Sequence, residues 1–434
     1  MPIWNAEYET MERAALRDLQ LRRLQAMVAW VYERVPYYRS ALESRGVRPR
    51  DIKSLADVAK LPFTDKITLR DTYPFGLFAV DLDEVVRIHS SSGTTGKPTV
   101  VGYTRGDIST WTELTARVAS AAGVVHTDRA QMAFGYGMFT GGFGMHYGLE
   151  RVGATVIPAS AGNTERHLMM MQDFGTTVLV STPSYALYIA EVAEQIGIDF
   201  AQLRLRLGLF GAEPCSEAAR REIEEKLHIV ATDNYGLSEV MGPGVSGECE
   251  AQAGLHINED HFLVEIVDPT SGESLPDGRE GELVITPLTK EAFPVLRYRT
   301  HDLTRLHTDR CECGRTLSRM EKVRERTDDM LIIRGVNVFP SQVEDVLFKI
   351  EGIRPHYLIV VDRKHGLDDV ELRIEVAEEV FSDIMADMVA FTKHVSERLQ
   401  AVLGLQVKVT LVEPGTIERT AGKAQRVLDK REGC

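Results

Sequence analysis

A short run of small, hydroxyl and cationic residues is the first stretch whose residue types suggest a functional site. Residues 90–99 read S-S-S-G-T-T-G-K-P-T, between two segments that look like strands. Backbone N–H groups, hydroxyls and a lysine on such a loop can converge on a phosphate. The spacing is not that of a Walker A loop, because two residues separate the glycines and a proline follows the lysine. We predict a phosphate-binding loop, with a plain polar hairpin as the alternative, made of Ser91, Ser92, Gly93, Thr94, Thr95, Gly96 and Lys97.

Three further polar or aromatic residues follow strand-like segments. Tyr136 lies in G-Y-G-M-F-T-G-G, Glu213 in F-G-A-E-P and Glu239 in Y-G-L-S-E. The strand-like segments alternate with helix-like ones, which predicts a mostly parallel sheet with helices on its faces. Ligands of such sheets bind beyond the carboxyl ends of the strands. We therefore expect the three side chains to share one cleft.

The rest of the chain must position that cleft. Apolar periodicity predicts helix over residues 9–45, and a strand, loop and strand follow around 85–104. After about residue 255 the sequence reads as strands and turns, and from about 330 as a compact α+β tail with a long helix at 381–402. We predict an α/β protein with a large N-terminal domain, its sheets mostly parallel and flanked by helices, and a small α+β C-terminal domain.

Composition limits the class of protein. The chain has 434 residues, a net charge of −14, 44% hydrophobic residues and 26% charged ones, as is typical of a globular protein of more than one domain. The negative charge argues against nucleic acid as a partner. The acidic N-terminus lacks the apolar core of a signal peptide, and the longest apolar runs are too short to span a bilayer. With five cysteines, an odd number, the sequence predicts a reducing compartment, the cytoplasm.

Six motifs in one order carry a family resemblance. They are S-S-S-G-T-T-G-K-P, F-G-A-E-P, Y-G-L-S-E, Y-R-T-H-D, R-T-D-D-M-L-I-I-R-G and G-K-A-Q-R. Together they resemble the adenylate-forming enzymes, which include acyl-CoA synthetases, luciferases and the adenylation domains of peptide synthetases. Longer stretches, such as D-D-M-L-I-I-R-G-V-N-V-F-P-S-Q, are similar to the phenylacetate-CoA ligase branch.

The resemblance implies a two-step reaction. A carboxylate attacks the α-phosphate of ATP, and the thiol of coenzyme A then displaces AMP from the acyl-adenylate. Glu239, a hard oxygen ligand, would hold Mg²⁺, although a solvated glutamate at a helix start is the alternative. For Asp302, assigned to the ribose diol, the alternative is a surface ion pair. The resemblance assigns to the nucleotide Glu213, Tyr235, Asp302, Arg326, Arg334 and Gly335.

The resemblance also implies that the small domain rotates between the two steps. Lys423 matches the family's C-terminal lysine, which places a cation between the carboxylate and the α-phosphate. Asp328 matches the family's hinge. The predicted domains are therefore 1–327, with the acyl and ATP sites, and 328–434, which is mobile and carries the catalytic lysine.

An aromatic segment rich in glycine is the candidate binding site for the acyl group. Tyr136 and Phe139 could wall a flat aryl group, with room left by Gly141 and Gly142, although plain core packing is the alternative for the aromatics. The resemblance also implies a difference at Cys215, where the family often has tryptophan: the smaller side chain would widen a wall near the adenine or acyl site.

Four residues could hold a structural metal. Cys311 and Cys313 form a C-x-C-G turn, and Cys249 and His256 lie in G-E-C-E-A-Q-A-G-L-H. Three cysteines and one histidine are a standard Zn²⁺ set, and similar sets occur in some relatives of the phenylacetate-CoA ligase branch. Two unrelated pairs of reduced thiols are the alternative.

The sequence thus predicts an aryl-acid CoA ligase, with phenylacetate the first choice of acid. Hydroxyphenylacetate, indoleacetate, benzoate and anthranilate are alternative acids, and an enzyme that loads a carrier protein is a second class. A zinc-binding module of nucleic-acid type is a third class, which the acidic charge opposes. The expected partners are the aryl acid, ATP and coenzyme A, without nucleic acid or membrane, and a homodimer is left open.

Overall fold

The computed structural model of the chain describes residues 1–90, 98–323, 325–327, 331–333, 336–364, 367–377, 385–419 and 424–431. Below, residues 1–327 are called the N-terminal part, and the described residues of 331–431 the C-terminal part. Some predicted functional residues lie outside the described ranges: Ser91, Ser92, Gly93, Thr94, Thr95, Gly96, Lys97, Asp328, Arg334, Gly335 and Lys423.

The chain begins with helices, as its periodicity predicts. The helical stretch expected over residues 9–45 is broken at Val35, which is extended with φ −113° and ψ 104°. Pro36 causes the break, because proline has no N–H and disfavours a helical residue before it. The helices here are α1 (Ala6–Glu9), α2 (Arg13–Arg34), α3 (Pro36–Ser44), η1 (Pro49–Asp51), η2 (Leu55–Lys60), α4 (Lys66–Asp71) and η3 (Leu82–Glu84).

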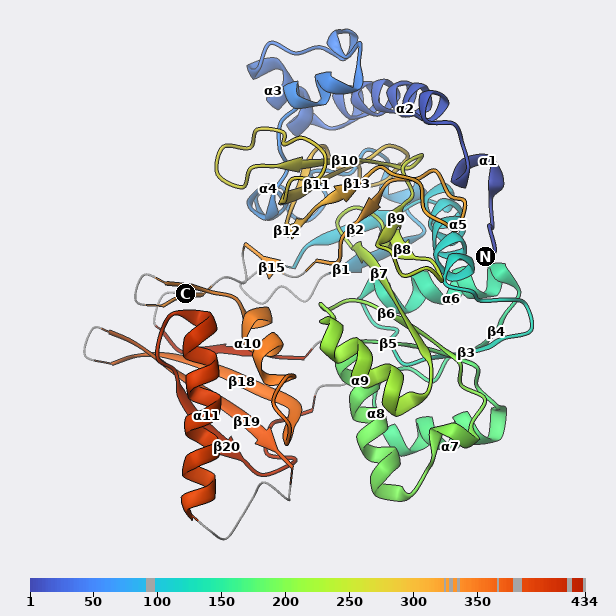
Figure 1. Cartoon of the computed structure of the whole chain (residues 1–434). Coiled ribbons are helices and arrows are strands. Elements are labelled where there is room, and N and C mark those ends of the chain that lie inside the picture. Colours follow the sequence, from blue (N-terminus) through green and yellow to red (C-terminus); the bar gives the residue numbers. More distant parts are fainter. Residues whose placement is uncertain are drawn as a thin grey trace.

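A large sheet forms the centre of the N-terminal part, in the order β13-β14-β9-β8-β7-β6-β5-β3-β4. Strands β4, β3, β5, β6 and β7 pair in parallel, and the others pair antiparallel. The strands are β3 (Arg129–Met132), β4 (Thr155–Ile157), β5 (Val178–Ser181), β6 (Leu207–Phe210), β7 (Val230–Leu237), β8 (Gly242–Glu248), β9 (Leu255–Ile257), β13 (Leu306–His307) and β14 (Arg319–Met320). The flanking helices are α5 (Arg105–Ala121), α6 (Thr140–Val152), α7 (Thr164–Phe174), α8 (Pro183–Ile196) and α9 (Glu217–Leu227). This confirms the predicted α/β class (Figure 1).

Two smaller sheets complete the N-terminal part. β1 (Arg87–Ser90) and β2 (Val100–Tyr103) pair antiparallel, with Ser90 opposite Val100, so the predicted phosphate-binding loop does join two paired strands. The other sheet runs β10-β11-β12-β15 and is antiparallel. Its strands are β10 (Phe262–Val267), β11 (Gly281–Pro287), β12 (Tyr298–Thr304) and β15 (Glu325–Arg326).

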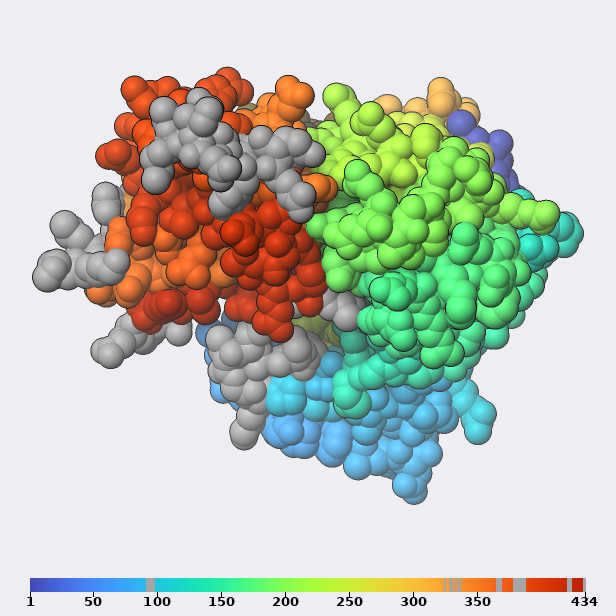
Figure 2. Space-filling view, turned by 90° about the horizontal axis from the view of Figure 1, so that it is seen from below, coloured from blue at the N-terminus to red at the C-terminus, as the bar shows by residue number. Residues whose placement is uncertain are grey.

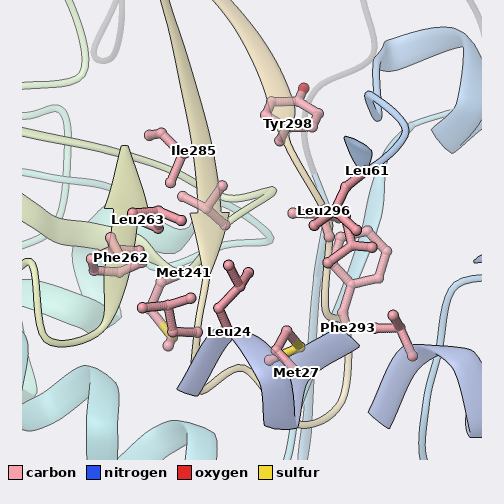
Figure 3. Close-up of a cluster of buried hydrophobic side chains, with 14 of the residues drawn as sticks. Leu24, Met27, Leu61, Met241, Phe262, Leu263, Ile285, Phe293, Leu296 and Tyr298 are labelled. Carbon is pink, nitrogen blue, oxygen red and sulfur yellow. The ribbon is translucent and has the colours of Figure 1, made fainter. Parts of the chain in front are cut away.

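The apolar face of α2 packs against this antiparallel sheet. Leu24 and Met27 of α2 meet Phe262 and Ile285 of the sheet, and all four side chains are buried (Figure 3). Burial of each such side chain stabilises the fold by about 1.5–3 kcal/mol. The same cluster includes Tyr298, which starts β12, the strand that carries Asp302. The N-terminal helix thus fixes a strand of the candidate site.

The C-terminal part has its own sheet and core, as predicted. The sheet runs β20-β19-β18-β21, and its core includes Tyr357, Leu372 and Leu399. Strand β21, which the sequence does not predict, pairs in parallel with β18. The elements are β16 (Leu331–Ile333), β17 (Val336–Val338), α10 (Pro340–Leu347), β18 (Ile353–Lys364), β19 (Leu367–Val376), α11 (Met385–Leu403), β20 (Lys408–Val412) and β21 (Val427–Asp429).

The two parts lie side by side. Figure 1 shows the C-terminal part next to α8 and α9, and Figure 2 shows its red residues directly against green residues of the N-terminal part. Phe348, at the end of α10, packs against the hydrophobic cluster of α8 and α9. In the described part of the chain, no helix is both long and apolar enough to cross a membrane.

Candidate active site

The predicted cleft residues gather at one edge of the central sheet. Tyr136 follows β3, Glu213 follows β6, and Glu239 follows β7. These strands are parallel, and β5 lies between β3 and β6 in the sheet. The carboxyl ends of parallel strands meet at the same edge, so the alternation of strands and helices brings these three residues to one side of the molecule.

Three residues predicted to bind the nucleotide form one hydrogen-bonded cluster. Tyr235 of β7 donates from its hydroxyl to Oδ2 of Asp302, at 2.5 Å. Arg326 donates from Nη1 to Oδ1 of the same carboxylate, also at 2.5 Å, because β12 and β15 pair with Asp302 opposite Arg326. Asp302 is only 2% exposed, and burial raises the pKa of Tyr235. Of the surface ion pair weighed for Asp302, the ion pair with an arginine is present, but it is not at the surface, since the carboxylate is buried.

Substitution of Asp302 tests this cluster. Asp302→Ala leaves the Arg326 guanidinium and the Tyr235 hydroxyl without their shared acceptor. Hydrogen bonds to charged groups are worth about 1.5–3 kcal/mol, so kcat/KM for ATP should fall about 10–100-fold. Initial rates at varied ATP measure this. Asp309→Ala is the control, because the Asp309 side chain is 72% exposed and should leave ATP kinetics unchanged. An unaltered KM for ATP in Asp302→Ala would show that the cluster only supports the fold.

Glu239 lies close to the same cluster. Burial raises the pKa of its carboxyl, while the positive charges of Lys66 and Arg326 act in the opposite direction. For a partly buried carboxylate of this kind, a nearby cation favours the ionised form. Its neighbour Ser238 shares a hydrogen bond of 2.9 Å with Thr140, which starts α6. The turn after β7 is thereby attached to the helix that follows Tyr136.

Tyr136 takes part in a chain of hydrogen bonds. Its hydroxyl lies 2.9 Å from Nδ1 of His146, and Nε2 of His146 lies 3.1 Å from a carboxylate oxygen of Glu150. The Tyr136 ring also meets Phe143 edge to face, with centroids 5.3 Å apart. Burial raises the pKa of Tyr136, so its hydroxyl stays protonated. This chain fixes the orientation of the ring on the wall of the predicted aryl slot.

The other residues of the predicted slot are placed differently. Phe139 is 43% exposed, and its ring covers Gly141, where an added Cβ would lie 2.3 Å from it. At Gly142 an added Cβ would lie 2.7 Å from the carbonyl oxygen of Gly135. Both glycines therefore allow close packing within the segment 135–142. The core packing weighed for Phe139 is wrong, because the side chain is partly exposed.

The aryl slot can be tested at Tyr136. Tyr136→Ala removes a ring that contacts Phe143 and His146, and should raise KM for phenylacetate about tenfold or more, with KM for ATP within twofold of the parent. Tyr136→Phe is the matched control, because it keeps the ring and loses only the hydroxyl. Steady-state kinetics for both substrates decide the point. Equal effects on both KM values would mean that Tyr136 only supports the fold.

Glu213 lies at the N-terminus of α8. Its Oε1 accepts from the backbone N–H of Ser184, at 2.6 Å, and its Oε2 accepts from the backbone N–H of Ala424, at 3.0 Å. A carboxylate at this end of a helix is favoured by the helix dipole. Glu213 thus joins α8 to a C-terminal residue, a contact that the sequence does not suggest. Its predicted role at the nucleotide stays a prediction.

The four candidate metal ligands do come together. Cys249, His256, Cys311 and Cys313 are buried, and their ligand atoms all lie within 4.8 Å of one another. The two unrelated pairs weighed as the alternative are therefore wrong. Sγ of Cys249 lies 3.8 Å from Sγ of Cys311, and Sγ of Cys313 lies 3.4 Å from Nε2 of His256. A tetrahedral site with Zn–S of about 2.3 Å and Zn–N of about 2.0 Å puts sulfurs about 3.8 Å apart and sulfur about 3.5 Å from nitrogen.

The surroundings of this cluster tie it to the start of the chain. The neighbouring Cys249 thiol and His256 ring lower the pKa of Cys313, so a thiolate is favoured there. Arg315, 1% exposed, donates to Glu9 at 2.6 Å and to the carbonyl oxygen of Pro2 at 2.7 Å. The turn that holds two of the cysteines is thus fastened to α1 and the segment before it.

Some residues of the site are not apparent from the sequence. His146 and Glu150 are four residues apart on α6, a spacing that places them on one face, but nothing in the sequence links them to Tyr136. Lys66 starts α4, more than 170 residues before Glu239. Only the folded chain shows that these groups meet.

Comparisons with known proteins agree with this geometry. The family model for AMP-binding enzyme matches residues 27–287, and the model for the AMP-binding enzyme C-terminal domain matches residues 335–431. The chain is similar to phenylacetate-coenzyme A ligase of Thermus thermophilus, with 50% identity over 99% of this chain and 100% of the relative. It is also similar to phenylacetate-coenzyme A ligase of Escherichia coli, with 48% identity over 99% of each chain.

Two solved structures of 2-hydroxyisobutyryl-CoA ligase match this chain to different degrees. 2-Hydroxyisobutyryl-CoA ligase in its postadenylation state, with 2-HIB-AMP, matches with a TM-score of 0.93 at 31% identity, over 99% of this chain and 93% of that chain. In its thioesterification state, with 2-HIB-AMP and CoA, the TM-score is 0.73 at the same coverage. The arrangement of the present structure is therefore more similar to that of the postadenylation structure than to that of the thioesterification structure. The AMP-binding family model matches more than half of the chain, and two phenylacetate-coenzyme A ligases are about half identical to it over almost its full length. The chain therefore belongs to the AMP-binding enzymes and, among these, to the phenylacetate-coenzyme A ligases.

Proposed function

We propose that this chain joins phenylacetate to coenzyme A at the expense of ATP, through phenylacetyl-adenylate, with release of pyrophosphate and AMP. The observation that carries the proposal is the hydrogen-bonded cluster of Tyr235, Asp302 and Arg326, in which Asp302 is buried and which offers a ring and a carboxylate to a nucleotide. The near-full-length likeness to phenylacetate-coenzyme A ligases supports phenylacetate as the acid.

Each residue has a defined task in this proposal. Asp302 accepts from the ribose hydroxyls, while the Tyr235 ring covers one face of the adenine. Residues 91–97 hold the phosphates, and Lys423 supplies positive charge between the acid and the α-phosphate. Glu239 would hold Mg²⁺, which neutralises phosphate charge when bound. Partly buried and close to Lys66 and Arg326, Glu239 has the acidic, oxygen-donor character that this ion prefers.

We also propose two domains, 1–327 and 328–434, which change their relative position about Asp328. Support comes from the TM-scores against the two states of 2-hydroxyisobutyryl-CoA ligase, 0.93 and 0.73 at equal coverage, since equal coverage with a lower score means that some parts are placed differently. The C-terminal part has a hydrophobic core of its own, which supports its movement as a unit.

A structural zinc ion at Cys249, His256, Cys311 and Cys313 is a further element of the proposal. The sulfur–sulfur and sulfur–nitrogen distances agree with tetrahedral coordination. Four protein ligands leave no open position, so the ion would stabilise the fold and take no part in the reaction. The free thiols of the described cysteines also support a reducing compartment, such as the cytoplasm.

A panel of acids tests the proposed activity. Purified enzyme is mixed with ATP, Mg²⁺ and CoA, and AMP and thioester are measured with phenylacetate, hydroxyphenylacetates, indoleacetate, benzoate and anthranilate. We expect the highest kcat/KM for phenylacetate. A higher value for another acid would change the substrate, and AMP release that requires a phosphopantetheine-bearing protein in place of free CoA would favour the carrier-loading alternative.

A further inference from the structure

Two carboxylates, one on α8 and one beside the start of α8, contact the C-terminal part. Ser184, Tyr188 and Glu191 are spaced at four and three residues, so they lie on one side of the helix. Figure 1 shows α8 and α9 as the helices of the N-terminal part nearest to the C-terminal part. The two contacts are made by the Glu191 carboxylate and, at the start of the helix, by Glu213.

Glu191 receives two donors from the C-terminal part. Its Oε2 accepts from Nε2 of His356, at 3.2 Å, and from Nη2 of Arg419, at 3.4 Å. Glu191 is 9% exposed and His356 7%, so the contact is largely shielded from water. Burial raises the pKa of Glu191, but the hydrogen bond from His356 and the charge of Arg419 outweigh it, and the pKa lies below its usual value. The carboxylate is therefore ionised in this arrangement.

Arg419 keeps a second partner within the C-terminal part. Its Nη1 and Nη2 donate to the two carboxylate oxygens of Glu375, each at 2.7 Å, and its guanidinium lies 5.8 Å from the centroid of the Tyr188 ring. Glu375 is fully buried. When the C-terminal part moves away, Arg419 stays paired with Glu375 and loses Glu191 and the Tyr188 ring. The contact with Glu191 can therefore break without leaving a buried unpaired cation.

The second contact is made by Glu213. Its carboxylate bridges the backbone N–H of Ser184, in the first turn of α8, and the backbone N–H of Ala424. Arg419 and Ala424 are the described residues on either side of segment 420–423, and Lys423 belongs to that segment. Two carboxylates of the N-terminal part thus hold the residues that precede and follow the segment with the catalytic lysine.

We propose that Glu191 and Glu213 are positioning residues for adenylation: they dock the C-terminal part against α8 and fix both flanks of segment 420–423. The inference rests on the proposed function, in which Lys423 acts in the first step only. The arrangement described is similar to that of 2-hydroxyisobutyryl-CoA ligase in its postadenylation state, with a TM-score of 0.93, whereas the score against the thioesterification state is 0.73. Loss of these contacts should therefore impair acyl-adenylate formation and spare thioester formation.

The test compares the two half-reactions in point variants. Pyrophosphate release from ATP and phenylacetate reports the first step, and conversion of synthetic phenylacetyl-adenylate with CoA reports the second. Glu191→Ala should slow the first step about tenfold and leave the second within twofold or faster. Glu191→Gln keeps an acceptor for both donors and should fall between Glu191→Ala and the parent. Glu213→Ala should act in the same direction as Glu191→Ala.

A matched control lies on the same helix. Glu194 is exposed and three residues beyond Glu191, so Glu194→Ala should leave both half-reactions unchanged. An unchanged first step in Glu191→Ala and Glu213→Ala, or an equal loss in both steps, would overturn the inference. If the parent enzyme did not form phenylacetyl-adenylate, the proposed function itself would be wrong. Adenylate formation by the parent enzyme is therefore measured before any variant. Thermal unfolding of each variant separates a loss of fold from a loss of docking.

Discussion

A Lys423→Ala enzyme should lose phenylacetate-dependent pyrophosphate release by on the order of 10²–10³, as for other lost transition-state donors. The acid and the α-phosphate are both anions, and the first step brings them together, so a cation between them stabilises the transition state more than the ground state. The second step has no such need, because the acyl-adenylate carries no carboxylate. The same variant should therefore convert supplied phenylacetyl-adenylate and CoA to thioester at close to the parent rate.

The complementary variant is at the proposed hinge. Proline fixes φ near −65°, so Asp328→Pro should hinder rotation of the C-terminal domain, preserve adenylation and lose thioester formation. Lys393→Ala is the control for loss of a lysine, because Lys393 is exposed on α11 and pairs only loosely with Glu397, at 3.8 Å. Both half-reactions are measured separately. If Lys423→Ala and Asp328→Pro each lost both steps in parallel, alternation between two arrangements would be wrong for this chain.

Loss of the metal cluster should have the largest effect on stability. Enzyme purified without added zinc should hold about one equivalent, and Cys313→Ser should lower the free energy of unfolding by about 4–5 kcal/mol or more. The reason is that the four ligands come from segments as far apart as residues 249 and 313, and the ion would fasten them. Metal analysis and thermal unfolding measure the two quantities, and kcat/KM of the folded variant should change little.

A second buried cysteine controls for the substitution itself. Cys215 is 8% exposed and lies outside the cluster, so Cys215→Ser removes a buried thiol without touching the proposed metal ligands. It should cost clearly less stability than Cys313→Ser. If the enzyme without metal were folded, active and as stable as the enzyme with metal, the zinc proposal would be wrong. If Cys215→Ser and Cys313→Ser lost equal stability, burial of the thiol alone would explain the effect.

The sequence predicts those parts of the molecule that depend on local patterns. Strand–helix alternation identifies the central sheet, and the motifs around Tyr235, Asp302 and Arg326 identify three side chains that the fold brings into contact. It also identifies the four metal-cluster residues, whose ligand atoms meet as expected. In each case a residue type within a short motif indicates both the chemistry and the element that carries it.

Contacts between distant segments are what the sequence does not predict. Glu191 is separated from His356 by 165 residues and from Arg419 by 228, and on a helix such a glutamate is usually part of a solvated face. The pairing of β21 with β18 is missed because V-L is a very short apolar run between polar residues. The break at Val35 is missed because the apolar periodicity continues on both sides of Pro36.

The bond between Arg315 and Glu9 has a consequence for how the chain is made. Glu9 is synthesised 306 residues before its partner. At about 5–20 residues per second, it leaves the ribosome roughly 15–60 s before Arg315 does. During that time α1, a helix of four residues, lacks the contact that holds it, and a helix so short does not persist alone. The residues of α1 are thus made well before they take their final place, and they do so only when the cysteine turn at 311–313 has also emerged.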